Sequence, residues 1–110
     1  IDYNSIYNAI ISKFDAVEKC NLKYKEELSQ GLSTYATNDE CFQILFSTYN
    51  NISQMKWEDK YRRVYLMLDM ARNQYYNALG RTMYEDTYFS EARNYVNQAK
   101  TEWAAANSGF

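Results

Sequence analysis

The sequence contains no histidine and no proline, and its three glycines are Gly31, Gly80 and Gly109. Without histidine the chain lacks the commonest general base and the commonest metal ligand, and a Ser-His-Asp triad is impossible. Without proline, and with so few glycines, almost nothing interrupts a hydrogen-bonded helix. The composition therefore predicts a helical protein and argues against histidine-dependent catalysis.

Other catalytic patterns are also missing. No glycine-rich loop could hold a phosphate group. Adjacent acidic residues occur as Glu26-Glu27, Asp39-Glu40, Glu58-Asp59 and Glu85-Asp86. Neighbouring side chains on a helix point about 100° apart, so these pairs do not converge on one substrate atom. We therefore predict no enzymatic activity, no cofactor and no metal.

Charge of one sign and long apolar runs are absent as well. The net charge is −2, which favours neither a nucleic-acid binder nor an acidic tail. No run approaches 18 apolar residues, so no transmembrane helix is expected. Hydrophobic residues make up 46% of the chain, enough for one domain, 1–110, with a sizeable core. A start at Ile1 fits a mature chain whose leader was removed, and it also fits a trimmed chain.

The chain is organised around the stretch from Trp57 to Leu79. Its apolar residues recur at alternating steps of four and three, which places them on one side of an α-helix. This stripe consists of Trp57, Tyr61, Val64, Leu68, Ala71, Tyr75 and Ala78. Leu66 and Met70 lie on the far side, so the apolar surface is wider than a single surface helix needs. Such a helix is typical of the middle of a bundle.

The same spacing predicts four helices, near residues 4–30, 38–50, 54–79 and 83–105. The second helix is about half as long as the others, and its predicted apolar face consists of Cys41, Phe42, Leu45, Phe46 and Tyr49. Amphipathic helices joined by short loops pack against one another. The predicted fold is therefore all-α, an irregular antiparallel four-helix bundle.

Several residues are expected to mark helix ends. Gly31 is predicted to end the first helix in a left-handed conformation. Thr37 with Glu40, and Thr82 with Glu85, form capping-box patterns at the starts of the second and fourth helices. A break is expected at Asn50-Asn51, where Asn51-Ile52-Ser53 forms an N-glycosylation sequon. Whether Asn51 carries a glycan stays open.

Cys20 and Cys41 are the only cysteines, and both lie among apolar helix positions. They could be two buried free thiols of a cytosolic protein. Alternatively, a disulfide joins the first helix to the start of the second, and closing this loop contributes roughly 3 kcal/mol in the chain-entropy model. The even number of cysteines and the missing leader favour the disulfide and a secreted protein.

A basic cluster marks the start of the third predicted helix and consists of Lys56, Lys60, Arg62 and Arg63. One interpretation is a solvated face paired with Glu58 and Asp59. The other is contact with an anionic patch on a partner protein. Nucleic acid is disfavoured, because the rest of the chain does not add to the positive field.

Tyrosine is present in surplus, with twelve residues. Most lie on predicted core stripes, but Tyr65 and Tyr76 lie at the edge of the third-helix stripe, beside Arg72. Exposed tyrosine, methionine and arginine are enriched at protein interfaces. The predicted partner-binding residues are Arg62, Tyr65, Leu66, Met70 and Tyr76. The alternative is that another helix covers this side.

In its size, helical character, two cysteines and lack of catalytic groups, the whole chain resembles small salivary proteins of blood-feeding mosquitoes. It is similar in particular to the anopheline complement inhibitors of the albicin and anophensin type. The resemblance implies a secreted, monomeric protein that binds a host protein complex, with the alternative-pathway complement C3 convertase as the expected target.

Two other functions stay open. One is a carrier of a small hydrophobic ligand held between aromatic-lined helices, which would require a large apolar cavity. The other is a helical adaptor domain of a microbial or viral protein, which would have reduced cysteines and an obligate partner.

Overall fold

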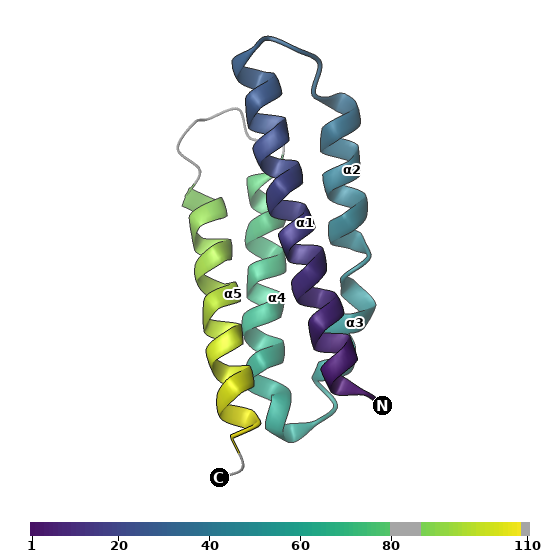
Figure 1. The fold of residues 1–110 in the computed structure, drawn as a ribbon, viewed down its shortest axis with the longest axis vertical. Coiled ribbons are helices and arrows are strands. Elements are labelled where there is room, and N and C mark those ends of the chain that lie inside the picture. The colour runs from purple at the N-terminus through teal and green to yellow at the C-terminus, as the bar shows by residue number, and fades with distance from the viewer. Residues whose placement is uncertain (80–86, 109–110) are drawn as a thin grey trace.

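The computed structural model describes residues 1–79 and 87–108. All regular structure in these two ranges is helical, which confirms the predicted all-α class (Figure 1). The elements are α1 (Tyr3–Ser29), α2 (Tyr35–Phe46), α3 (Tyr49–Met55), a 3₁₀ turn η1 (Asp59–Tyr61), α4 (Arg62–Ala78) and α5 (Thr87–Ala106).

The bundle consists of two helical hairpins. In the first hairpin, α2 and α3 together run back along α1, and we call them the second arm (Figure 1). In the second hairpin, α5 runs back along α4. The molecule measures 52 × 23 × 15 Å along its principal axes. In the described ranges, none of the helices combines the length and the apolar character needed to span a bilayer. The predicted irregular four-helix bundle is therefore confirmed, with its second arm divided in two.

Local hydrogen bonds fix both ends of α1. Asp2 is the N-cap, because its carboxylate accepts from the Ser5 amide at 3.1 Å and from the Ser5 hydroxyl at 2.7 Å. These bonds hold the pKa of Asp2 below its ordinary value. At the other end Gly31 has φ +69°, and the Leu32 amide donates to the Glu27 carbonyl at 2.9 Å. The predicted left-handed end at Gly31 is confirmed, because only glycine adopts this conformation without strain.

The predicted capping box at Thr37 is wrong. The second arm begins three residues earlier than expected, at Tyr35, so Thr37 lies inside the first turn of α2 and is buried. The Thr37 carbonyl oxygen lies 3.4 Å from Cys20 Sγ, so packing against α1 fixes this turn instead of a side-chain cap. The second predicted capping box, Thr82 to Glu85, lies outside the described residues.

The predicted border between the second and third helices is also wrong. The break falls at Ser47-Thr48 instead of Asn50-Asn51, and α3 then continues the same arm as far as Met55. Asn51 consequently lies within a helix and is half-buried. The buried Thr48 hydroxyl donates to the Leu45 carbonyl at 2.7 Å, which stabilises the bend between α2 and α3.

Trp57 does not belong to the core stripe. The chain reverses direction at residues 56–58, and Trp57 is 74% exposed on this turn, with the Lys56 ammonium 4.8 Å from its ring centre. The stripe begins instead at Tyr61, and its later members on α4 are buried as predicted: Val64, Leu68, Ala71, Tyr75 and Ala78. Periodicity missed the turn because Trp57 and Tyr61 still stand four residues apart.

The core differs between the two hairpins. On α4 and α5 the buried stripes include alanines, namely Ala71, Ala78, Ala92 and Ala99. Small side chains allow two helix backbones to approach closely, and α4 and α5 lie close together over a longer stretch than any other pair. Between the hairpins the space is filled by large side chains such as Phe14 and Tyr75, whose ring centres are 5.4 Å apart.

The predicted disulfide between Cys20 and Cys41 is present, with 5.6 Å between the two Cα atoms. Both cysteines are buried, one in the C-terminal half of α1 and the other in α2. The bond therefore fixes α2 against α1 within the first hairpin.

Stacked aromatic rings close the end of the bundle opposite the disulfide. The Trp103 indole lies between Tyr7, at 4.1 Å between ring centres, and Tyr61, at 4.7 Å. Tyr3 packs on the other side of Tyr61 at 5.2 Å. The Tyr61 hydroxyl also donates to Asn107 Oδ1 at 2.8 Å. These contacts join α1, η1 and the C-terminal end of α5.

Candidate partner-binding site

The five predicted partner-binding residues lie along α4 but differ in exposure. Arg62 is exposed, and Leu66 and Met70 are 47% and 40% exposed. Tyr65 and Tyr76 are partly buried and pack against the core. The predicted set is therefore a ridge of three exposed side chains, with two tyrosines at its edge.

The basic cluster near the start of α4 is partly paired with neighbouring groups. Arg62 forms an ion pair with Asp59 at 2.8 Å, as the solvated-face interpretation expects. Both side chains are largely exposed, so this pair contributes little to stability. The Lys60 ammonium lies 5.0 Å from the centre of the Tyr61 ring.

A second set of residues lies beside this ridge, where α2 and α3 meet α4. We call Phe42, Phe46, Tyr49, Arg72 and Tyr76 the arginine–aromatic patch. The Tyr76 ring lies 5.4 Å from both phenylalanine rings. The Arg72 guanidinium carbon lies 5.1 Å from the centre of the Tyr49 ring and 5.3 Å from that of Tyr76.

Helical spacing and the bend in the second arm assemble this patch. Phe42 and Phe46 are one turn apart on α2, and Arg72 and Tyr76 are one turn apart on α4, so each pair shares a helix face. Tyr49 is the first residue of α3 and follows the bend at Ser47-Thr48. The Lys13 ammonium donates to the Ser47 carbonyl at 3.0 Å and holds this bend against α1.

The patch is accessible to a partner. Phe46 is 47% exposed and Tyr49 is 55% exposed. A shallow depression next to them is lined by Arg72, Asn73, Tyr76 and Asn77. Aromatic and arginine side chains that are held in place and exposed together are typical of the energetic centre of a protein interface.

Sequence reasoning assigned the aromatic residues of the second arm to its buried face and so missed half of this patch. Phe42 is in fact half-buried, and Phe46 and Tyr49 are exposed. Phe46 lies off the buried face of α2 that Cys41 and Leu45 form, and Tyr49 follows the bend. Arg72 was noted only as a neighbour of Tyr76. The identifiable pattern in the sequence was the matched i, i+4 spacing of the two pairs, Phe42/Phe46 and Arg72/Tyr76.

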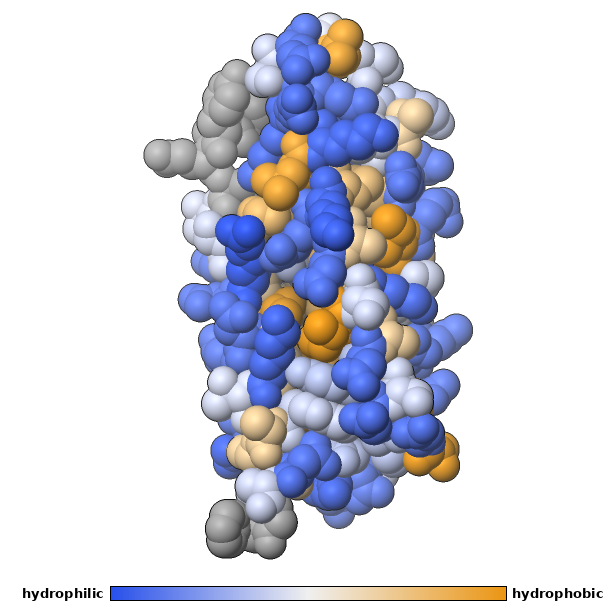
Figure 2. All heavy atoms as spheres, in the orientation of Figure 1, coloured by the Kyte–Doolittle hydropathy of each residue, from blue (hydrophilic) through white to orange (hydrophobic). Residues whose placement is uncertain are grey.

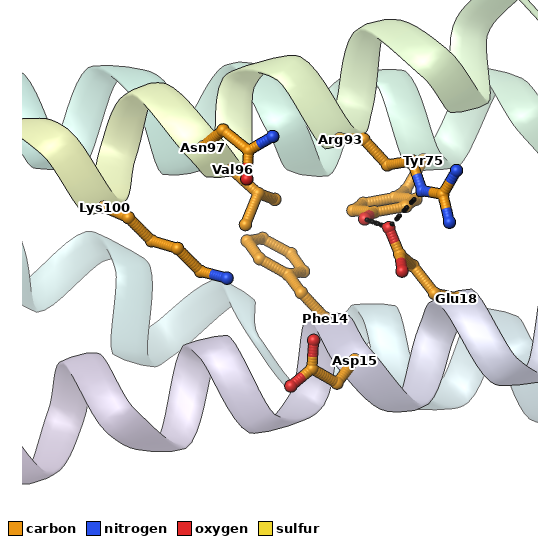
Figure 3. A pocket seen from close by; sticks show the side chains of 8 residues that line it. All are labelled: Phe14, Asp15, Glu18, Tyr75, Arg93, Val96, Asn97 and Lys100. Carbon is orange, nitrogen blue, oxygen red and sulfur yellow. Dashed lines mark hydrogen bonds and ion pairs between the residues drawn. The ribbon is translucent and has the colours of Figure 1, made fainter.

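A separate pocket of about 300 Å³ lies between α1 and α5, with Tyr75 of α4 at its base (Figure 3). Glu18 Oε1 accepts hydrogen bonds from the Tyr75 hydroxyl and from Arg93 Nε, both at 3.0 Å. Burial raises the pKa of the Tyr75 hydroxyl, and the negative charge of Glu18 raises it further. Tyr75 therefore stays a neutral donor over the physiological range.

This pocket is polar. It is lined by Phe14, Asp15, Glu18, Tyr75, Arg93, Val96, Asn97 and Lys100. Four of these eight side chains carry charge, so the pocket does not provide the apolar surroundings that a carrier of hydrophobic ligands requires. Because Glu18 is already bonded to both Tyr75 and Arg93, its role is to tie the two hairpins together.

Residues 1–79 and 87–108 contain no group of three or more acidic or cysteine side chains arranged to hold a metal ion. The hydropathy view of the α1 side shows mostly hydrophilic surface with small, separate hydrophobic areas (Figure 2). No protein-family model, curated protein sequence or solved structure matches the chain. The exposed ridge of α4 and the arginine–aromatic patch are therefore the surface on which a functional proposal can rest.

Proposed function

We propose that this protein is secreted, acts as a monomer and inhibits a host protein complex by occupying one of its surfaces. The target that we propose is the alternative-pathway complement C3 convertase, as for the salivary inhibitors that the chain resembles. The observation that carries the binding function is the arginine–aromatic patch, which is exposed on a disulfide-bonded helical bundle.

The architecture supports inhibition by binding. Helix faces in a packed bundle are already ordered, so little conformational entropy is lost on association. In the proposed complex, the arginine–aromatic patch forms the centre of the contact. The exposed ridge of Arg62, Leu66 and Met70 extends the contact along α4.

The disulfide and the polar pocket bear on the two alternatives. An adaptor of a reducing compartment would keep its thiols reduced, whereas Cys20 and Cys41 are bonded to each other. A hydrophobic-ligand carrier would need an apolar cavity, whereas the pocket between α1 and α5 is lined by charged groups. Both observations favour a secreted inhibitor that acts by binding over the adaptor and the ligand carrier.

The test is lysis of erythrocytes by the alternative pathway in human serum, with and without the purified protein. We expect inhibition at micromolar concentration. The variant Arg62→Ala/Tyr65→Ala should weaken it, and Lys19→Ala, on the exposed side of α1, serves as the control.

Absence of inhibition at micromolar concentration would exclude complement as the target. Inhibition that is unchanged in Arg62→Ala/Tyr65→Ala would keep the function and place the site away from the start of α4.

A further inference from the structure

We propose that Arg72 is the binding site for a carboxylate side chain of the partner protein, with Asn73 and the Tyr76 hydroxyl beside it. This inference rests on the proposed binding function and adds the chemistry of the partner. The partner group is an aspartate or glutamate, flanked by apolar side chains that pack on Phe46 and Tyr49.

The guanidinium of Arg72 is held in position before any partner arrives. It lies 5.1 Å from the centre of the Tyr49 ring and 5.3 Å from that of Tyr76. The negative faces of aromatic rings attract a cation, but they accept no strong hydrogen bonds from its N–H groups. The two rings therefore hold the guanidinium next to Tyr49 and Tyr76 without satisfying its N–H groups.

Arg72 also has an unmet hydrogen-bonding requirement. Its Nε atom is buried and has no hydrogen-bond partner. A buried donor without a partner costs free energy. The terminal Nη atoms also have no acceptor among the described residues, and unlike Nε they are not buried, so they are the donors that a partner can reach. A carboxylate that lies in the plane of the guanidinium can accept from two N–H groups at once, which is the strongest geometry for this pair.

Two other arginines of the chain are already paired. Arg62 bonds to Asp59 at 2.8 Å and Arg93 bonds to Glu18 at 3.0 Å. Asp69 is one turn before Arg72 on α4, yet it forms no ion pair with it. Arg72 thus keeps an available positive charge in the middle of an exposed aromatic surface.

The shape of the site agrees with this chemistry. The depression at Arg72 is also lined by Asn73 and Tyr76, whose side chains supply further hydrogen-bond donors. None of the four residues that line the depression is acidic. A carboxylate therefore meets one positive charge, additional donors and an apolar rim formed by Phe46 and Tyr49.

The experiment follows the side-chain Nε–Hε signal of Arg72 by NMR while a blocked Leu-Glu-Leu peptide is added. The blocked Leu-Gln-Leu peptide is the neutral control. We expect a saturable shift with the glutamate peptide and binding of the glutamine peptide weaker by about tenfold or more.

Variants separate the role of Arg72 from general charge. Arg72→Gln should abolish the preference for glutamate, and Arg72→Lys should reduce it, because lysine keeps the charge but loses the planar fork. Lys19→Gln makes the same change in net charge at an exposed position of α1 and should leave binding unchanged. Asp69→Asn should strengthen binding, because it removes a negative charge one turn away on α4 that repels the incoming carboxylate. The amide spectrum of each variant establishes that it is folded.

Equal binding of the two peptides, or no shift of Arg72 with either, would overturn the carboxylate site. The same holds if Lys19→Gln weakens binding as much as Arg72→Gln does. These results do not depend on the complement assay. A glutamate-specific shift without serum inhibition would reject the convertase as target and retain the carboxylate site. Serum inhibition that is unaffected by Arg72→Gln would retain the convertase as target and reject the carboxylate site as part of the contact.

Discussion

The two hairpins of this bundle are held together in different ways. In the first, a disulfide between Cys20 and Cys41 joins α1 to α2. In the second, buried alanines such as Ala71 and Ala99 let α4 and α5 approach closely along their length. The first pair of helices thus relies on a covalent bond, and the second relies on the small size of its contact residues.

This difference matters for the candidate site, because the arginine–aromatic patch takes residues from both hairpins. Phe46 and Tyr49 come from the first, and Arg72 and Tyr76 come from the second. The relative position of the hairpins is set by contacts between them, including the hydrogen bond from Tyr75 to Glu18. A change confined to one hairpin should therefore displace only the patch residues that this hairpin contributes.

The largest expected effect is that of breaking the disulfide. Reduction, or Cys20→Ala/Cys41→Ala, should lower the free energy of unfolding by roughly 3 kcal/mol, because a loop of 21 residues is no longer closed in the unfolded chain. Urea denaturation of the oxidised and reduced protein measures the change. Hydrogen exchange should show α2 losing protection before α4. Loss of protection in α4 and α5 first would contradict the proposed division of the bundle.

A smaller effect is expected from enlarging an alanine in the second hairpin. Ala99→Leu should cost about 1–3 kcal/mol, because the larger side chain must be accommodated at a fully buried position. Ala105→Leu makes the same change at an exposed position of α5 and should stay within about 0.5 kcal/mol of the wild type. Thermal unfolding of the two variants compares them directly. Equal stability of both would show that close approach of α4 and α5 does not depend on alanine.

The smallest expected effect concerns Tyr75, which connects the hairpins. Because its pKa is raised in the folded protein, its contribution to stability is complete below the ordinary tyrosine pKa of about 10 and is lost as pH rises above it. The loss should be up to about 1.4 kcal/mol per pH unit. Denaturation of wild type and Tyr75→Phe between neutral and alkaline pH measures it, since the variant cannot ionise there. Parallel curves for the two proteins would show that Tyr75 ionises equally in the folded and unfolded states.

Most of the fold could be predicted from the sequence, because the apolar periodicity of a helix and the residues that mark its ends depend only on neighbouring positions in the chain. The stripe from Val64 to Ala78, the glycine end at Gly31 and the disulfide were all predicted correctly. The error at Trp57 arose because a turn can preserve helical spacing by chance. The Thr37 capping box failed because packing of α2 against α1 at Cys20 outweighed a favourable local sequence.

The candidate site was less predictable because it depends on contacts between distant segments. Leu66 and Met70 could be assigned to the outer side of α4 from spacing alone. The position of Tyr49 could not be assigned, because Tyr49 follows the bend at Ser47-Thr48 and helical spacing does not locate that bend. That Arg72 stacks on rings from two helices is likewise visible only once the chain is folded.

The positions of the two tryptophans give the protein an internal pair of optical reporters. Trp57 is already in water on the turn before η1, so its fluorescence should change little when the chain unfolds. Trp103 lies between two phenol rings, so a change in tryptophan emission on unfolding should come from the end of the bundle where α1, η1 and α5 meet. Conversely, in the folded protein iodide should quench the fluorescence of Trp57 far more readily than that of Trp103. Unfolding and quenching measurements therefore follow two separate places in the molecule without any added label.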